Sequence, residues 1–278
     1  MTAALGFQSD WWAVLTSDLM LRGLLGGVLV AIAAGLVGPF VHLRNEGFAT
    51  HTMAHVGFPG AIGAALVGWP TSIGVALACG LSGLAIGGLG RRPEERDIAT
   101  GTVLAAATAL GVLLSSFAAH GTVLVTATLF GNLTSISTDQ LVGFAAGTVI
   151  VGVVIAFVGR PLLFSTVSPD VAAARGVPTS ALSMGFVMTL ALVVTMAIQV
   201  VGTLLLFALV VTPSATAFAW TGRAAPARCA SIAIGVAGVL GGLAVSAMFD
   251  LPPSVPIVGL LVVGWCASTL ATRTKGRS

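Results

Sequence analysis

Apolar segments long enough to cross a lipid bilayer dominate this sequence and decide the solvent in which it folds. A spanning helix needs about 20 mainly apolar residues. Nine stretches come near that length, and only 8% of the 278 residues are charged, against about 25% in an ordinary soluble domain. The stretches are 22–42, 48–69, 71–90, 100–119, 141–159, 181–200, 203–220, 229–248 and 255–272. The sequence therefore predicts an all-α, polytopic membrane helical bundle that forms a single transmembrane domain over residues 1–278.

One apolar segment is too short to be counted as a span, and another leaves the number of crossings at eight or nine. Residues 122–136 are apolar but too short to span comfortably, and they end beyond Phe130-Gly131-Asn132. We expect a re-entrant or surface segment there, which is tolerated only where protein surrounds the backbone. Residues 203–220 are interpreted as a crossing, which gives nine, whereas a re-entrant segment at that position would give eight.

Basic side chains are divided unevenly between the two sets of loops that nine crossings create. Arg22 stands alone on one side, and the other eleven of the twelve Lys and Arg residues fall on the opposite side. Cytoplasmic loops carry the excess of Lys and Arg, so we predict a cytoplasmic C-terminus and an N-terminus outside. Because these residues sit at the edges of apolar stretches, they do not indicate a nucleic-acid partner. Residues 1–21 contain no Lys or Arg, whereas a signal peptide starts basic.

Three of the four histidines fall in one short segment, from His42 to His55. Ionisable residues inside a membrane are costly and are candidates for function. His51 and His55 are four residues apart, so in a helix their imidazoles lie one above the other on one face. Neutral imidazole suits Zn, Cu, Fe and Ni. We favour a metal-binding pair over the alternative, in which each histidine is hydrogen-bonded at a helix interface.

Other polar residues are candidates for the path of an ion or for ordinary helix contacts. Three of them lie within or beside apolar runs: His120, Asn132 and Thr212. His120 falls near an outer loop, where an arriving ion would pass. Three further residues are expected to be solvated at the cytoplasmic edge: His42, Arg44 and Glu46.

A helix-forming pattern interrupts the polar loop between two predicted spans, at about residues 168–177. Ser168 suits a cap, Pro169 suits the first helical position, and Gly176 suits a C-terminal stop. A docking helix for a cytoplasmic partner has this form, and a bare connector does not need it. The chain also lacks the phosphate-binding pattern G-x-x-x-x-G-K-[ST], so any ATP-driven activity requires a separate subunit.

Three motifs together resemble the ABC-3 family, the membrane permease subunits of zinc and manganese ABC importers. The family has an Arg, an Asp-x-x-x-His pair and a Pro-Gly, and those places hold Arg44, His51, His55, Pro59 and Gly60. The second motif is Pro169-Asp170-Val-Ala172 with Gly176-Val-Pro178, and the third is Val201-Gly202, an aliphatic run and Thr212-Pro213-Ser-Ala215-Thr216-Ala217. The matches are spread from about residue 40 to 260.

The resemblance implies a transport permease, not an enzyme, in a bacterial plasma membrane. Two copies would form a homodimer, separate ABC ATPase subunits would dock on the cytoplasmic side, and an extracellular metal-binding protein would dock outside. The segment that contains Pro169, Asp170, Ala172 and Gly176 would be the coupling helix on the ATPase, and His55 would contact the ion. ATP would drive alternating access, with the divalent metal as cargo and no permanently bound cofactor.

One position departs from the family pattern, because the usual Asp is His51 in this chain. Imidazole suits zinc and carboxylate suits manganese, so we expect zinc over manganese, with iron or an iron chelate as further options. The change leaves open whether His51 contacts the ion.

Two rival functions remain for such a chain. An ion-gradient-driven metal carrier usually places carboxylates near the membrane midplane, but every Asp and Glu here falls near a predicted edge or in a loop. An intramembrane metalloprotease needs H-E-x-x-H, and the segment from His51 to His55 lacks that Glu.

Overall fold

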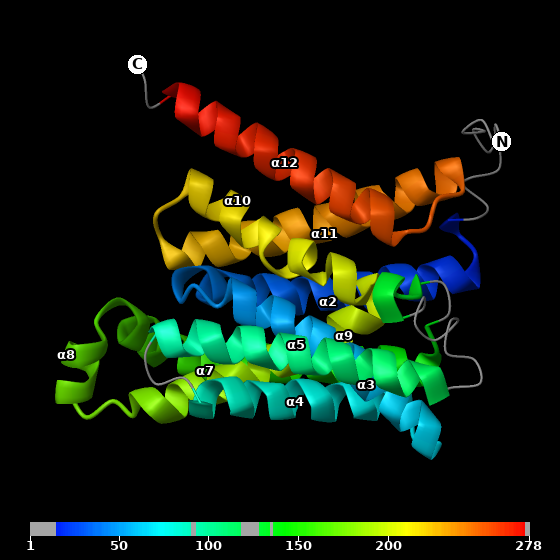
Figure 1. The fold of residues 1–278 in the computed structure, drawn as a ribbon. Helices are drawn as coiled ribbons and strands as arrows, with labels where there is room; N and C mark the ends of the chain where they lie inside the picture. The colour runs from blue at the N-terminus through cyan, green and yellow to red at the C-terminus, as the bar shows by residue number, and fades with distance from the viewer. Residues whose placement is uncertain (1–14, 90–92, 118–127, 134–135, 276–278) are drawn as a thin grey trace.

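The structure is a computed structural model that describes residues 15–89, 93–117, 128–133 and 136–275 (Figure 1). Within these ranges the regular elements are helices, which confirms the all-α prediction. They are α2 (Asp18–Leu43), α3 (Gly47–Val67), α4 (Thr71–Leu89), α5 (Pro93–Phe117), α7 (Thr138–Val167), α8 (Pro169–Ala174), α9 (Thr179–Val210), α10 (Thr212–Trp220), α11 (Ala224–Phe249) and α12 (Ser254–Lys275).

Local sequence signals explain where several helices begin and end. The Ser17 hydroxyl accepts a hydrogen bond from the Met20 backbone N–H at 3.4 Å and caps α2. Ser137 and Gln140 form a reciprocal capping box at the start of α7, with bonds of 2.9 and 3.2 Å. Gly68, with φ 78°, ends α3 in the left-handed conformation that glycine adopts without strain.

The described part of the chain contains nine membrane-length or near membrane-length segments. Seven helices are long and apolar enough to cross a bilayer: α2, α4, α5, α7, α9, α11 and α12. The eighth segment is α3, which is 21 residues long and packs beside α4, α5 and α9. Its hydropathy is reduced by His51 and His55. The ninth is the shorter apolar segment Leu206–Trp220.

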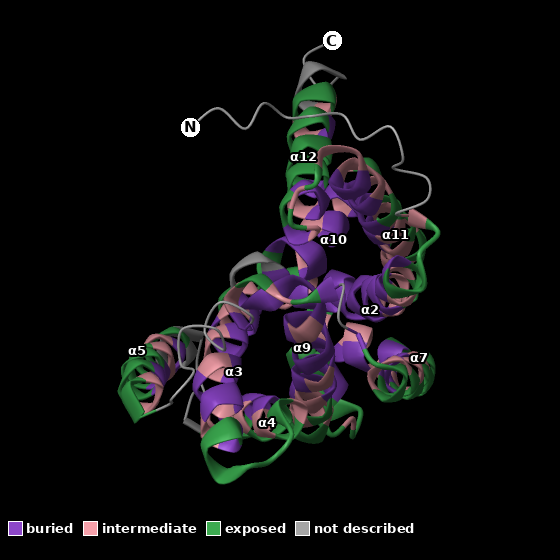
Figure 2. Ribbon diagram, turned by 90° about the vertical axis from the view of Figure 1, so that its right-hand side faces the viewer, coloured by how far each residue is buried: buried purple, intermediate pink, exposed green. Residues whose placement is uncertain are grey.

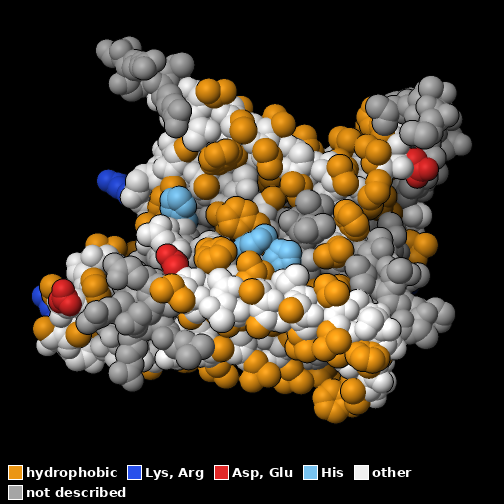
Figure 3. All heavy atoms as spheres, in the orientation of Figure 1, with side chains coloured by type: hydrophobic (Ala, Val, Ile, Leu, Met, Phe, Trp, Pro, Cys, Tyr) orange, Lys and Arg blue, Asp and Glu red, His pale blue; other side chains and the backbone are white. Residues whose placement is uncertain are grey.

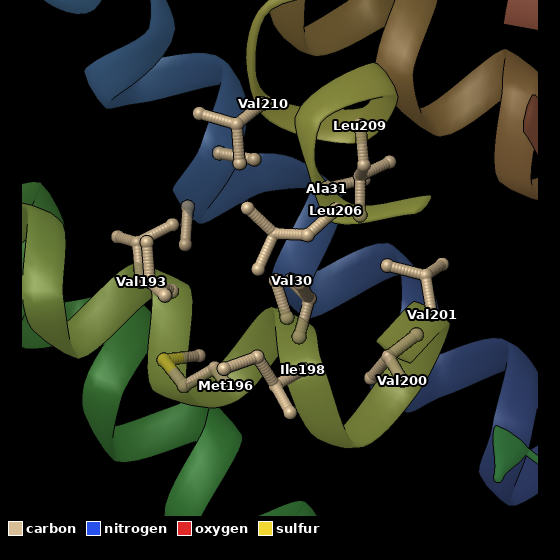
Figure 4. Packing of buried hydrophobic residues seen from close by; sticks show 14 of the residues in the cluster. Val30, Ala31, Val193, Met196, Ile198, Val200, Val201, Leu206, Leu209 and Val210 are labelled. Carbon is tan, nitrogen blue, oxygen red and sulfur yellow. The ribbon is translucent and has the colours of Figure 1, made fainter. Parts of the chain in front are cut away.

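Gly202 reverses the chain between the sixth and seventh crossings, which are α9 and the segment Leu206–Trp220. It has φ 79° and ψ 171° inside the apparent span of α9. The residues before Gly202 and the residues after it lie on either side of Val30 and Ala31 in α2 (Figure 4). Near the end of the returning segment, the Phe218 ring stacks on His42, at the end of α2, with centroids 5.0 Å apart. Residues 203–220 therefore traverse the bundle, but as a broken segment and not as one straight helix.

With that crossing included, the first turn of α2 and the last turn of α12 lie at opposite ends of the bundle (Figure 1). The predicted odd number of crossings thus agrees with the path of the chain.

The described part of the predicted re-entrant segment packs against the backbone at Gly202. Residues 122–127, 134 and 135 of that segment lie outside the described residues. Gly131 has φ 73°, and a Cβ there would lie 2.6 Å from the Gly202 nitrogen. Leu133 and Ile136 are only 3% and 4% exposed. One side of this segment is therefore packed against protein, while Phe130 and Asn132 are exposed.

Burial separates a central pair of helices from a lipid-facing periphery (Figure 2). In α2 and α9, 67% and 72% of the most apolar window is buried, against 22% in α5 and α12. On α7, Val149, Val153 and Phe157 are four residues apart and Phe157 is 80% exposed. A stripe of large apolar side chains at this spacing is a helix face suited to lipid.

Candidate metal pair and its surroundings

The two predicted metal ligands lie together on the first half of α3. The ring centroids of His51 and His55 are 4.6 Å apart, and the ring planes meet at 73°. Both side chains are half-buried. Figure 3 shows two histidines side by side near the middle of one face of the molecule, among hydrophobic side chains. The structure thus gives the one-face arrangement that the four-residue spacing predicts.

An aromatic side chain from a distant segment completes the wall beside the pair. The Phe207 ring lies 6.1 Å from the His51 ring at an interplanar angle of 89°, and 40% of Phe207 is exposed. Sequence reasoning missed Phe207, because it falls in an aliphatic run after Gly202 and no local pattern ties it to His51.

The pair supplies two possible metal ligands, which is fewer than the four ligands of a closed zinc site. A structural zinc site is almost always four-coordinate. Among the described residues, no group of three or more His, Cys, Asp or Glu side chains is placed to hold one metal ion. Within the described part of the chain, the pair therefore differs from a closed zinc site.

Two of the three other candidate path residues lie in the described part of the chain. His120 lies outside the described residues. Asn132 lines a cavity of about 120 Å³ together with Gln140 and Gln199, and neither His51 nor His55 lines that cavity.

Thr212 occupies the junction between α9 and α10. It is the first residue of α10, and its carbonyl oxygen accepts a bond from the Thr216 hydroxyl at 2.9 Å. Thr212 therefore lies within the broken crossing.

Arg44 and Glu46 correct the expectation of solvated edge residues. Their side chains are only 10% and 7% exposed, and the Arg44 Nε donates to the Glu46 Oε1 at 2.9 Å. The loop between α2 and α3 lies against the end of α7 and the start of α9. The other two guanidinium nitrogens of Arg44 donate hydrogen bonds to hydroxyl groups on these two helices. His42 is exposed, as predicted.

The short helix predicted at residues 168–177 is α8, at one end of the bundle (Figure 1). Pro169 is at the start of the helix, and Gly176, just beyond it, has φ 78°. Ala172 is fully buried and anchors the helix, whereas Pro169, Asp170 and Gly176 are exposed. A partner at this end of the bundle could reach these exposed residues.

In the described part of the chain, seven helices long and apolar enough to cross a bilayer, with a pair of half-buried histidines on α3, define a multi-pass membrane protein. A model of the ABC 3 transport family matches residues 16–271. The chain belongs to the ABC 3 transport family, and the resemblance noted from its motifs is confirmed.

Known proteins that resemble this chain are membrane components of metal transport systems. The manganese transport system membrane protein MntC of Halalkalibacterium halodurans is 31% identical over 247 residues, which cover 88% of this chain and 84% of that protein. The high-affinity zinc uptake system membrane protein ZnuB of Buchnera aphidicola is 22% identical over 243 residues, with 87% and 93% covered. The solved structure of PsaBC from Streptococcus pneumoniae in complex with Fab superposes with a TM-score of 0.84 at 24% identity and covers 94% of both chains.

Proposed function

We propose that this chain is the permease subunit of an ATP-driven importer of divalent transition-metal ions. Membership of a transport family over residues 16–271 supports the transport class. The observation that carries the choice of cargo is the contact between His51 and His55, with ring centroids 4.6 Å apart on one face of α3. His55 lies about 12 Å along the axis from the start of α3, at 1.5 Å per residue, so a metal held there lies within the length of the helix and away from its end.

We further propose that two copies pair across the face that carries the histidines. The pair is visible on an uncovered face of the chain (Figure 3), and a second copy there would bring four imidazoles to one central passage. Two ligands from each copy suit a transport path, because a conducting site must also release its ion.

The positions of charged residues at the two ends of the bundle support a proposed orientation in the membrane. Arg44, Arg175 and Arg223 lie at helix ends on the side of α8, whereas Arg22 lies in the first turns of α2 at the other end (Figure 1). By the positive-inside rule we place α8 and the C-terminus in the cytoplasm and the N-terminus outside. There α8 would dock on an ABC ATPase subunit, and an extracellular metal-binding protein would deliver the ion at the opposite end, beside the cavity that Asn132 lines.

Manganese is the better supported cargo, in place of the zinc expected from sequence alone. The relative that shares 31% identity is named for manganese transport, and the zinc-named relative shares 22%. His51 still favours zinc, since imidazole suits zinc and carboxylate suits manganese. We propose that the importer carries both ions and that His51 sets their ratio.

Changing His51 to aspartate is expected to raise the ratio of manganese to zinc uptake several-fold. A carboxylate restores a negative, harder ligand at that position. The measurement is competitive uptake of the two ions by the complete transporter. His42→Asp is the matched control, because His42 is exposed at the end of α2 and stacks on Phe218. An unchanged ratio in a transport-competent His51→Asp variant would mean that His51 does not contact the ion.

Dependence on ATP separates the proposed importer from a gradient-driven carrier. In vesicles that contain this chain, its ATPase subunit and its binding protein, metal uptake is expected to require ATP and both partners. The described Asp residues support this choice, because Asp18, Asp139, Asp170 and Asp250 lie in first turns or at helix termini and Asp97 lies in the second turn of α5. Uptake by this chain alone, driven by a proton or sodium gradient, would refute the proposal.

A further inference from the structure

Arg44 links the helix of the histidine pair to the two helices that flank α8. It belongs to the short loop between α2 and α3, in which Asn45 adopts φ 55°. Its Nε bonds to Glu46, whose backbone carbonyl oxygen accepts from both the N–H and the hydroxyl of Thr50 at 2.9 and 2.8 Å. Thr50 is in the first turn of α3 and directly precedes His51. The guanidinium is therefore tied to the end of α3 that carries the pair.

The remaining guanidinium nitrogens reach across to helices far away in the sequence. Nη1 donates to the Thr166 hydroxyl at 3.3 Å, three residues before α8 begins. Nη2 donates to the Ser183 hydroxyl at 2.7 Å, near the start of α9. The Thr166 hydroxyl donates its own hydrogen to the Leu162 carbonyl oxygen at 2.7 Å. Its oxygen therefore acts as the acceptor in the bond with Arg44. Arg44 therefore binds one helix before α8 and one helix after it.

We call the Arg44 guanidinium and its hydrogen bonds to Glu46, Thr166 and Ser183 the fork. Its geometry and its burial make it a stiff connection between helices. Guanidinium is planar and presents its donors in a fixed arrangement, and bonds from a charged donor are stronger than neutral ones. The Arg44 side chain is only 10% exposed, and its guanidinium carbon lies 5.5 Å from the centre of the Phe186 ring in α9. A buried charge is retained only where its hydrogen bonds are satisfied. The fork thus holds three parts of the bundle in one arrangement.

A cavity beside the fork provides the space for these parts to move. Its volume is about 630 Å³, and Arg44 and Glu46 form part of its wall. Thr166 and Pro169 line it from the α7–α8 side, and Met53 lines it from α3. A shift of α8 can therefore be taken up in this cavity while the fork carries the shift to α3.

We propose that Arg44 is a positioning residue that transmits displacement of α8 to the helix of the histidine pair. This inference rests on the proposed function, in which an ATPase moves α8. It adds the route by which the movement is transmitted. A displacement of α8 moves the end of α7 and the start of α9. Through the hydroxyl groups of Thr166 and Ser183 this movement displaces Arg44, and through Glu46 it displaces α3. The bonds to Thr166 and Ser183 are the transmitting contacts, and the bond to Glu46 fixes the receiving end.

The test measures metal uptake and ATP hydrolysis together in vesicles that contain the complete transporter. In the double variant Thr166→Val, Ser183→Ala the fork loses two charge-assisted bonds, and uptake per ATP hydrolysed is expected to fall roughly tenfold. The rate of ATP hydrolysis and the amount of assembled complex stay unchanged. Arg44→Lys is expected to lower the same ratio, because a single ammonium cannot reproduce the fork.

Thr189→Val is the matched control for this experiment. Thr189 is also on α9, but its hydroxyl donates at 2.8 Å to the Gly185 carbonyl oxygen of its own helix, so its ratio is expected to equal that of the unaltered transporter. An unchanged ratio in the double variant or in Arg44→Lys overturns the inference, as does failure of the double variant to assemble. Absence of ATP-dependent uptake by the unaltered transporter overturns the proposed function as well.

Discussion

Replacing His55 with alanine is expected to abolish metal uptake while the protein still reaches the membrane. The change removes one of the two imidazoles whose centroids lie 4.6 Å apart on α3. Even the outer partners of metal ligands are worth about 10–100-fold in affinity or activity, so we expect a loss of at least about 100-fold for a direct ligand. Alanine is a good helix former and adds no polar group to the membrane. The fold of α3 should therefore be kept.

The measurement combines uptake with the amount of protein in the membrane fraction. His42→Ala is the control, since it removes an exposed histidine at the end of α2. Its uptake is expected to remain near that of the unaltered protein. Normal uptake by His55→Ala would contradict the assignment of the pair to the ion path, whereas loss of the protein from the membrane would indicate a structural role.

Alanine at Gly202 is expected to have the largest effect on stability. The backbone there, with φ 79° and ψ 171°, lies in a region that is essentially restricted to glycine. A Cβ would also overlap the Leu129 carbonyl oxygen and lie 2.5 Å from the Gly131 nitrogen, both of which are backbone atoms. Strain and overlap together should destabilise the protein by about 4 kcal/mol or more, a magnitude reached only by a few specific mechanisms.

Thermal unfolding of the purified protein in detergent would measure this effect. Gly185→Ala is the matched control, because a Cβ at Gly185, also on α9, would enter open space. An alanine there should be neutral or slightly stabilising, by up to about 1 kcal/mol. Equal unfolding temperatures for the two variants would show that the reversal at Gly202 tolerates a side chain.

The crossings and the short helix were predictable because both depend on local chemistry. Length and hydropathy locate the spans, since a bilayer excludes unpaired backbone groups and accepts apolar side chains. Pro169 and Gly176 mark the limits of α8 by the conformations that these residues favour. The broken crossing was harder to predict: 203–220 has the composition of a span, and only packing against α2 and the Gly131 turn explains why Gly202 reverses the chain.

By itself, the sequence determined that the chain is an all-helical membrane protein and that His51 and His55 share one face. The first result follows from the length and hydropathy of the apolar stretches, and the second follows from the 3.6-residue period of a helix. Only the tertiary structure decided what surrounds that face. Phe207 lies against His51, and Arg44 is buried through hydrogen bonds to residues 122 and 139 positions away. Such partners are set by how helices pack, because no local pattern in the sequence records which distant hydroxyl groups a buried charge will meet.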